Sequence, residues 1–108
     1  MTILADGREV RDVVLPLSAP LTGQAKVAVT GTAVPLGAGV LFNGVLVKAA
    51  TSNVGTILIG TSAVTVTVGG AGNGYPLAPG DTVVFAAGNL SQVFINGTAN
   101  DYVSFAGN

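Results

Sequence analysis

The sequence predicts an all-β protein, a single antiparallel β-sandwich or jelly-roll-like domain with an extended N-terminal arm. Short runs of residues alternate between apolar and polar with a period of two, as half-buried strands do. Most of the 16 glycines, and the Asn-Gly and Pro-Gly pairs, fall between these runs, which is typical of short strands joined by tight turns. No helical period lasts longer than one turn. At 108 residues the chain is expected to form one domain.

Residues 1–24 differ in composition from the rest and are predicted to form the arm, which leaves residues 25–108 for the sandwich. Five of the nine charged residues lie in residues 6–12. Pro16 and Pro20 then exclude a continuous central strand and favour extended backbone. The apolar residues of the arm need cover, either from the chain's own sheet edge or from a neighbouring subunit. These candidate interface residues are Ile3, Leu4, Val10, Val13, Val14, Leu15 and Leu17.

Seven runs rich in β-branched and aromatic residues are expected to be strands. In order along the chain they are residues 25–30, 44–49, 56–60, 63–68, 82–86, 92–96 and 102–106. The clearest alternation is in "AVTVTV" at residues 63–68, where three valines face away from two threonines. Between two of the runs, Pro79-Gly80 predicts a turn that Asp81 caps, with Leu77 entering the core before it.

Charge is scarce outside the arm, because residues 13–108 contain only Lys26, Lys48, Asp81 and Asp101. Soluble monomers use roughly 25% charged residues, and a net charge near zero favours association. We therefore expect much of the surface to be covered in the working state, with a neutral, Thr- and Gly-coated monomer as the alternative. The lack of a basic patch argues against nucleic-acid binding.

The charged start of the chain predicts no secretory signal, and the absence of cysteine fits synthesis in a reducing cytoplasm. Breaker residues interrupt every apolar run, so no membrane-spanning helix is expected.

Reactive side chains are equally scarce, since the chain has no histidine and no cysteine. Only a Ser/Lys scheme or a pair of carboxylates could supply catalysis, and the carboxylate candidates are Asp81 and Asp101. Turn closure is the commoner role of such aspartates, so we expect no enzyme activity. No metal is expected, because hard cations need several carboxylates. No cofactor is expected either, because the Gly-rich segments match neither a dinucleotide fingerprint nor a P-loop.

Residues 47–105 resemble a small β-sandwich module of bacteriophage accessory virion proteins. The resemblance rests on the order of five elements. They are Lys48-Ala49, a "Gly-x-Ile-x-Ile-Gly" strand at residues 55–60, a Ser/Thr/Val strand at 63–68, the "Gly-Tyr-x-Leu-x-Pro-Gly-Asp" turn at 74–81, and "Leu-x-x-Val-Phe-Ile-x-Gly" at 90–97. The family pattern also makes Asn43-Gly44 lead into a strand at residues 45–49, although an Asn-Gly pair alone predicts a hairpin turn.

The resemblance implies a structural role on the virion. It suggests a capsid decoration (cement) protein that binds the outside of the head, contacts the major capsid protein and stabilises the capsid by bridging shell subunits. Such proteins are often homo-oligomers, with a trimer favoured. The alternative is a tail or head-fibre module that binds a host receptor or glycan.

Overall fold

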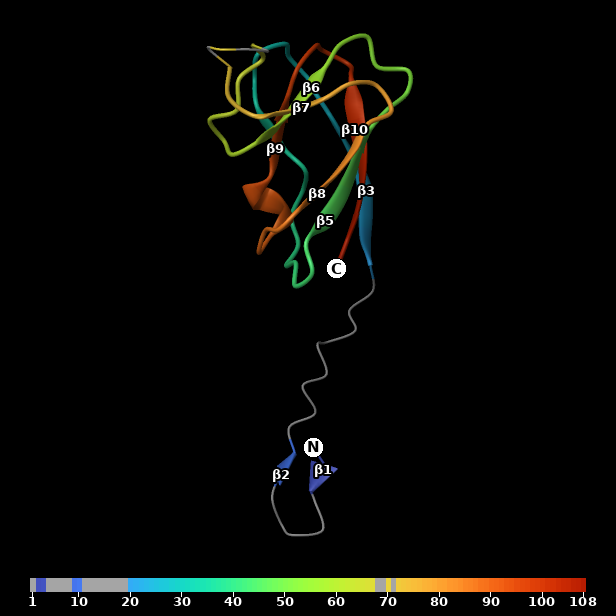
Figure 1. Cartoon of the computed structure of the whole chain (residues 1–108), viewed down its shortest axis with the longest axis vertical. Coiled ribbons are helices and arrows are strands. Elements are labelled where there is room, and N and C mark those ends of the chain that lie inside the picture. The colour runs from blue at the N-terminus through green and yellow to red at the C-terminus, as the bar shows by residue number, and fades with distance from the viewer. Residues whose placement is uncertain (1, 4–8, 11–19, 68–69, 71) are drawn as a thin grey trace.

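The computed structural model describes residues 2–3, 9–10, 20–67, 70 and 72–108, and its body is a sandwich of two four-stranded antiparallel sheets (Figure 1). The first, the β5 sheet, has the order β3 (Leu21–Lys26), β10 (Tyr102–Gly107), β5 (Val45–Ala49) and β8 (Thr82–Phe85). The second, the β6 sheet, has the order β4 (Val34–Pro35), β9 (Phe94–Asn96), β6 (Ile57–Gly60) and β7 (Tyr75–Leu77). A 3-10 helix, η1 (Leu90–Gln92), precedes β9. The prediction of an all-β sandwich is confirmed.

The core lies between the inner faces of the two sheets. In β5, Val45, Val47 and Ala49 are buried while the residues between them are exposed, as the period of two requires. The β6 sheet supplies a matching apolar layer, of which Ile59 and Ile95 are cross-strand partners. Burying each such side chain contributes about 1.5–3 kcal/mol, so these two layers hold the sheets face to face.

Six of the seven predicted strands are present with shifted ends, and the prediction of a strand at residues 63–68 is wrong. Here the chain makes a turn, in which Val64 N–H donates to Thr61 O at 2.9 Å, and Thr65 N–H then donates to Asn73 O at 3.0 Å. Val64 is buried beside Leu58 on the outer side of the β6 sheet, whereas Val66 is exposed. The sequence alternates as expected, but the segment packs on the outside of the β6 sheet instead of forming one of its strands.

The first strand of the sandwich begins before residue 25, where the predicted domain starts. Strand β3 begins at Leu21, directly after Pro20, and runs antiparallel to β10 from the Leu21–Gly107 pair to the Lys26–Tyr102 pair. Residues 28–30, expected to continue this strand, instead enter a turn in which Thr32 N–H donates to Val29 O. Nearer the N-terminus, β1 (Thr2–Ile3) pairs with β2 (Glu9–Val10).

The two turn predictions are confirmed. At Pro79-Gly80, Asp81 N–H donates to Ala78 O at 2.9 Å, its carboxylate accepts from Ala78 N–H at 3.0 Å, and Leu77 is fully buried. Gly80 has a φ of +89°, as the third residue of a type II turn requires. Asn43-Gly44 leads into β5, as the resemblance implied, and makes no two-residue hairpin.

Candidate interaction surface

The outer face of the β5 sheet is built on strands of four to six residues. Because side chains alternate along each strand, the outward residues of neighbouring strands line up in rows. One row crosses the sheet through Thr22, Ala106, Leu46 and Val84, and each member is the cross-strand partner of the next. A second row, through Gln24, Ser104, Lys48 and Thr82, follows two residues along.

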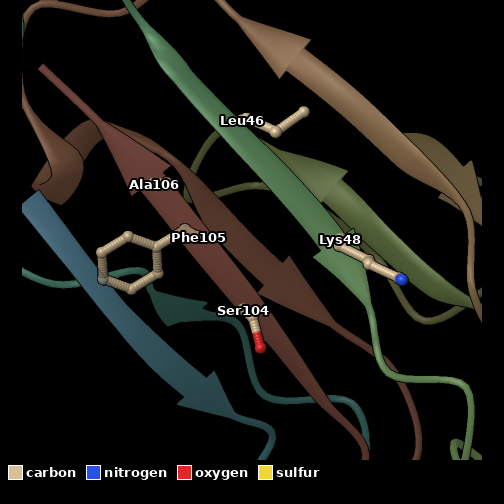
Figure 2. Close-up of a pocket in the computed structure, with 5 residues that line it drawn as sticks. All are labelled: Leu46, Lys48, Ser104, Phe105 and Ala106. Carbon is tan, nitrogen blue, oxygen red and sulfur yellow. The ribbon is translucent and has the colours of Figure 1, made fainter.

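The first row is apolar where a solvated face should be polar. Leu46 is 46% exposed and Val84 is 67% exposed, and Ala106 lies beside them. We call Ala106, Leu46 and Val84 the apolar strip. Figure 2 shows Leu46 on β5 and Ala106 on β10, with the Phe105 ring directed toward β3. The strip is therefore a feature of two central strands and one edge strand of a rigid sheet.

Two shallow depressions meet along this strip. One, of about 170 Å³, is lined by Leu46, Lys48 and residues 104–106 (Figure 2). The other, of about 330 Å³, extends from Pro20 past Asn43 and Asn108 to Val84. Their linings are mainly apolar and their floors are strands, so they suit contact with a protein surface better than enclosure of a small molecule.

The second row provides the polar groups of the face. Ser104 Oγ accepts a hydrogen bond from Gln24 Nε2 at 3.5 Å, and Lys48 is exposed one strand away. Ser104 and Lys48 are cross-strand partners on this face. The Ser104 hydroxyl is engaged with Gln24, and the row gives the apolar strip a polar border, as interaction surfaces have.

Charge is nearly absent from the described surface. Of the four charged residues in the sandwich, Asp101 is buried, so only Lys26, Lys48 and Asp81 are exposed among residues 20–67, 70 and 72–108. Designed and natural soluble surfaces are usually about 25–35% charged. A surface with three charges resists burial against a partner far less than an ordinary one, because few ions need to be desolvated.

The structure gives each candidate catalytic carboxylate a structural role in a different loop. Asp101 Oδ1 accepts from Val54 N–H and Asp101 Oδ2 from Gly55 N–H, both at 2.8 Å. Asp81 closes the Pro79-Gly80 turn. No cluster of three or more His, Cys, Asp or Glu residues that could hold a metal ion occurs among the residues that the structure describes.

The Asp101 contacts also fix a protruding apolar side chain. The Asn53 side chain and the Tyr102 backbone exchange two hydrogen bonds, so both ends of the segment 53–55 are held against β10. Val54, between them, is 86% exposed. The loop thus presents an apolar residue on a backbone whose polar groups are already paired.

The predicted interface residues of the arm are not brought to this surface by anything described. Ile3 and Val10 lie in β1 and β2, where only the backbone is described. Leu4, Val13, Val14, Leu15 and Leu17 lie outside the described residues.

Sequence reasoning missed the apolar strip itself, although a signal was present. In "VLVKA" and "TVVF" the positions that alternation assigns to solvent are Leu46 and Val84, which are apolar. An apolar residue at the outward position of two neighbouring strands would have identified the face.

No helix in the described part of the chain has the length and hydropathy needed to cross a bilayer. Comparison of the chain with protein-family models, curated proteins and solved structures finds no match.

Proposed function

We propose that this chain is a non-catalytic bacteriophage virion protein that decorates the outside of the head and bridges neighbouring shell subunits. The observation that carries the proposal is the exposed apolar strip on the outer face of the β5 sheet, where Lys26 and Lys48 are the charged residues. A face of this composition gains from being covered, as a docking surface on a large assembly would be. The order of motifs in residues 47–105 resembles that of virion accessory modules, and this resemblance is why we propose a phage particle as the assembly.

In this role the protein acts mechanically, with the major capsid protein as its partner. A stable protein contact buries about 800 Å² on each side, which is more than three side chains can supply. The apolar strip would be the centre of the contact and the polar row its border. The arm, with its apolar residues 13–17, would add to the area.

The first test adds the purified chain to phage heads that lack it and counts bound copies per particle. A copy number comparable with that of the major shell subunit is expected. A few copies confined to vertices or tail would instead support the fibre module that binds a host receptor or glycan. No binding would overturn the virion role.

Two variants identify the surfaces used. Leu46→Lys places a charge at the centre of the apolar strip and should reduce particle binding at least tenfold. Its control is Ser62→Lys, which adds the same charge at an exposed turn beside the β6 sheet. Deleting residues 1–12 should also weaken binding, and unchanged binding would remove the arm from the contact.

A further inference from the structure

One of the four sheet edges lacks the features that prevent strands from adding to it. The edge strands are β3 and β8 in one sheet and β4 and β7 in the other. Lysine and proline are the usual edge blockers. Lys26 lies in β3, Pro35 in β4 and Pro76 in β7, whereas β8 (Thr82–Phe85) contains neither residue type and no charge.

The backbone of β8 offers hydrogen-bonding groups to solvent. Ala49 N–H donates to Asp81 O and Ala49 O accepts from Gly80 N–H, both at 2.9 Å, so the backbone groups of Ala49 face β8 at the end of the β5–β8 ladder. Alternation along the ladder then directs the N–H and C=O of Val83 and Phe85 toward β5. The N–H and C=O of Thr82 and Val84 point away from the sheet, and so would those of Ala86 if the strand continued. All three of these residues are exposed.

We infer that β8 is a self-pairing edge, which joins two copies of the chain through an antiparallel β8–β8 ladder centred on Val84. Only residues whose backbone groups point outward can form the hydrogen-bonded pairs. Val84 therefore pairs with Val84 of the second copy, and Thr82 pairs with Ala86 of the second copy in both directions. The two sheets become one continuous sheet of eight strands around a two-fold axis.

In this register the side chains of one β8 strand fit against those of the second copy. On the outer face the two Val84 side chains meet, so the apolar strips of both copies join into one. On the inner face Val83 lies opposite Phe85 of the second copy, a β-branched–aromatic pair of the kind that stabilises ladders. Asp81 lies at one end of each strand, so the two carboxylates sit at opposite ends of the shared ladder. A second copy therefore meets no like charge on this edge.

The shortness of the ladder sets the strength of the pairing. A contact over five residues on each side is smaller than the roughly 800 Å² per partner of stable complexes. Pairing in solution should accordingly be reversible and dependent on concentration. The β8–β8 pairing predicts a dimer, in contrast to the trimer that the family resemblance implies.

Sedimentation equilibrium of the full chain over a concentration series tests the inference. The average mass should rise from 10.6 kDa toward twice that value. Val84→Pro removes the N–H at the centre of the ladder without removing a hydrogen bond within the sheet, since that N–H points outward. The variant should associate at least tenfold more weakly, with an unchanged circular dichroism spectrum. Val84→Thr keeps the N–H and should still pair.

A cross-linking experiment tests the register even if the proline variant folds poorly. The chain has no cysteine, so a single introduced thiol reports one position. Hydrogen-bonded antiparallel partners have Cα atoms about 5.5 Å apart, within disulfide range. Val84→Cys should therefore form a disulfide-linked pair under mild oxidation. Thr82→Cys is the matched control on the same exposed edge. In this register the residue 82 positions of the two chains are four residues apart along the ladder, so their Cα atoms are separated by roughly 14 Å and cannot form a disulfide.

Three results would overturn the inference: a mass that stays at 10.6 kDa at every concentration, association of Val84→Pro equal to that of the parent, or equal cross-linking of the two thiol variants. A limiting mass of three chains would replace the pair by the trimer. None of these results depends on particle binding, so they are separate from the test of the virion role.

Discussion

The side chain of Asn53 pairs with the backbone of Tyr102 as a neighbouring strand would. Asn53 Nδ2 donates to Tyr102 O at 2.9 Å, and Tyr102 N–H donates to Asn53 Oδ1 at 3.0 Å. One amide therefore satisfies both backbone groups of the first residue of β10, at the point where β5 has already ended.

We expect Asn53→Ala to destabilise the protein by about 2 kcal/mol, because two hydrogen bonds are lost and the partly buried Tyr102 N–H is left without a partner, whereas Tyr102 O keeps its bond from Ala50 N–H at 3.1 Å. For a domain of this size the melting temperature should fall by about 10 °C. Ser52→Ala, an exposed neighbour, serves as control and should change little. Equal melting temperatures for the two variants would show that the Asn53 pair does not stabilise the fold.

Asp101→Asn should destabilise by about 2–3 kcal/mol, measured by urea unfolding, since hydrogen bonds to charged groups are the stronger ones. The carboxylate accepts from two backbone N–H groups, and an amide offers only one oxygen and turns an NH₂ toward the other donor. Asp81→Asn is the comparison, because this exposed carboxylate accepts from a single N–H. A larger loss at Asp81 than at Asp101 would contradict the assignment of roles.

Gly44 and Gly31 distinguish two reasons why a position requires glycine, which are a positive φ and a lack of space for a Cβ atom. Both have a φ of +87°, but a Cβ at Gly44 would lie 2.5 Å from Phe85 O, whereas nothing lies within 4 Å of a Cβ at Gly31. Gly31→Ala should therefore cost about 1 kcal/mol, from backbone strain alone. Gly44→Ala should cost at least about 3 kcal/mol, because β5 and β8 must also move apart. Similar unfolding midpoints for the two variants would refute the steric part of this account.

Asn96 attaches the segment 61–67 to the β6 sheet. Its buried side chain donates to Val64 O at 3.0 Å and accepts from Gly97 N–H at 2.8 Å. Asn96→Ala should release the segment, and thermolysin should then cleave within residues 61–67 at least tenfold faster under native conditions. Thr67→Ala, an exposed change in the same segment, should leave the rate unchanged. Cleavage of Asn96→Ala elsewhere, or at the parental rate, would assign the attachment to Val64 packing instead.

Alternation and turn chemistry were enough to predict six of the eight strands of the two sheets. They did not predict the short strands β4 and β7, which contain Pro35 and Pro76, residues that argue against a strand. The same reasoning failed at residues 63–68, where the alternation is the most regular in the chain. Local pattern could not reveal that a buried amide, Asn96, and a turn at Thr61 would hold this segment outside the sheet. Both contacts join residues distant in the sequence or depend on the sheet already being formed.

The candidate surface was less predictable than the fold. The scarcity of charge was visible in the sequence, and it correctly indicated a surface poor in ions. The register of β10, β5 and β8, which aligns Ala106, Leu46 and Val84 into one strip, is a property of tertiary pairing. Sequence analysis placed its candidate interface residues in the arm, between residues 3 and 17, most of which lie outside the described residues.

The pairing of Leu21 with Gly107 places the first and last strands of the sandwich side by side, so the two ends of the sandwich chain are adjacent. A short linker from Asn108 to Leu21 would join them as a hairpin, and new termini could be opened at the exposed turn around Ser62. Such a circular permutant would keep every strand pair of both sheets while separating the sandwich from residues 1–20. The binding and self-association of the sandwich can therefore be measured without residues 1–20, or with these residues attached at the new terminus.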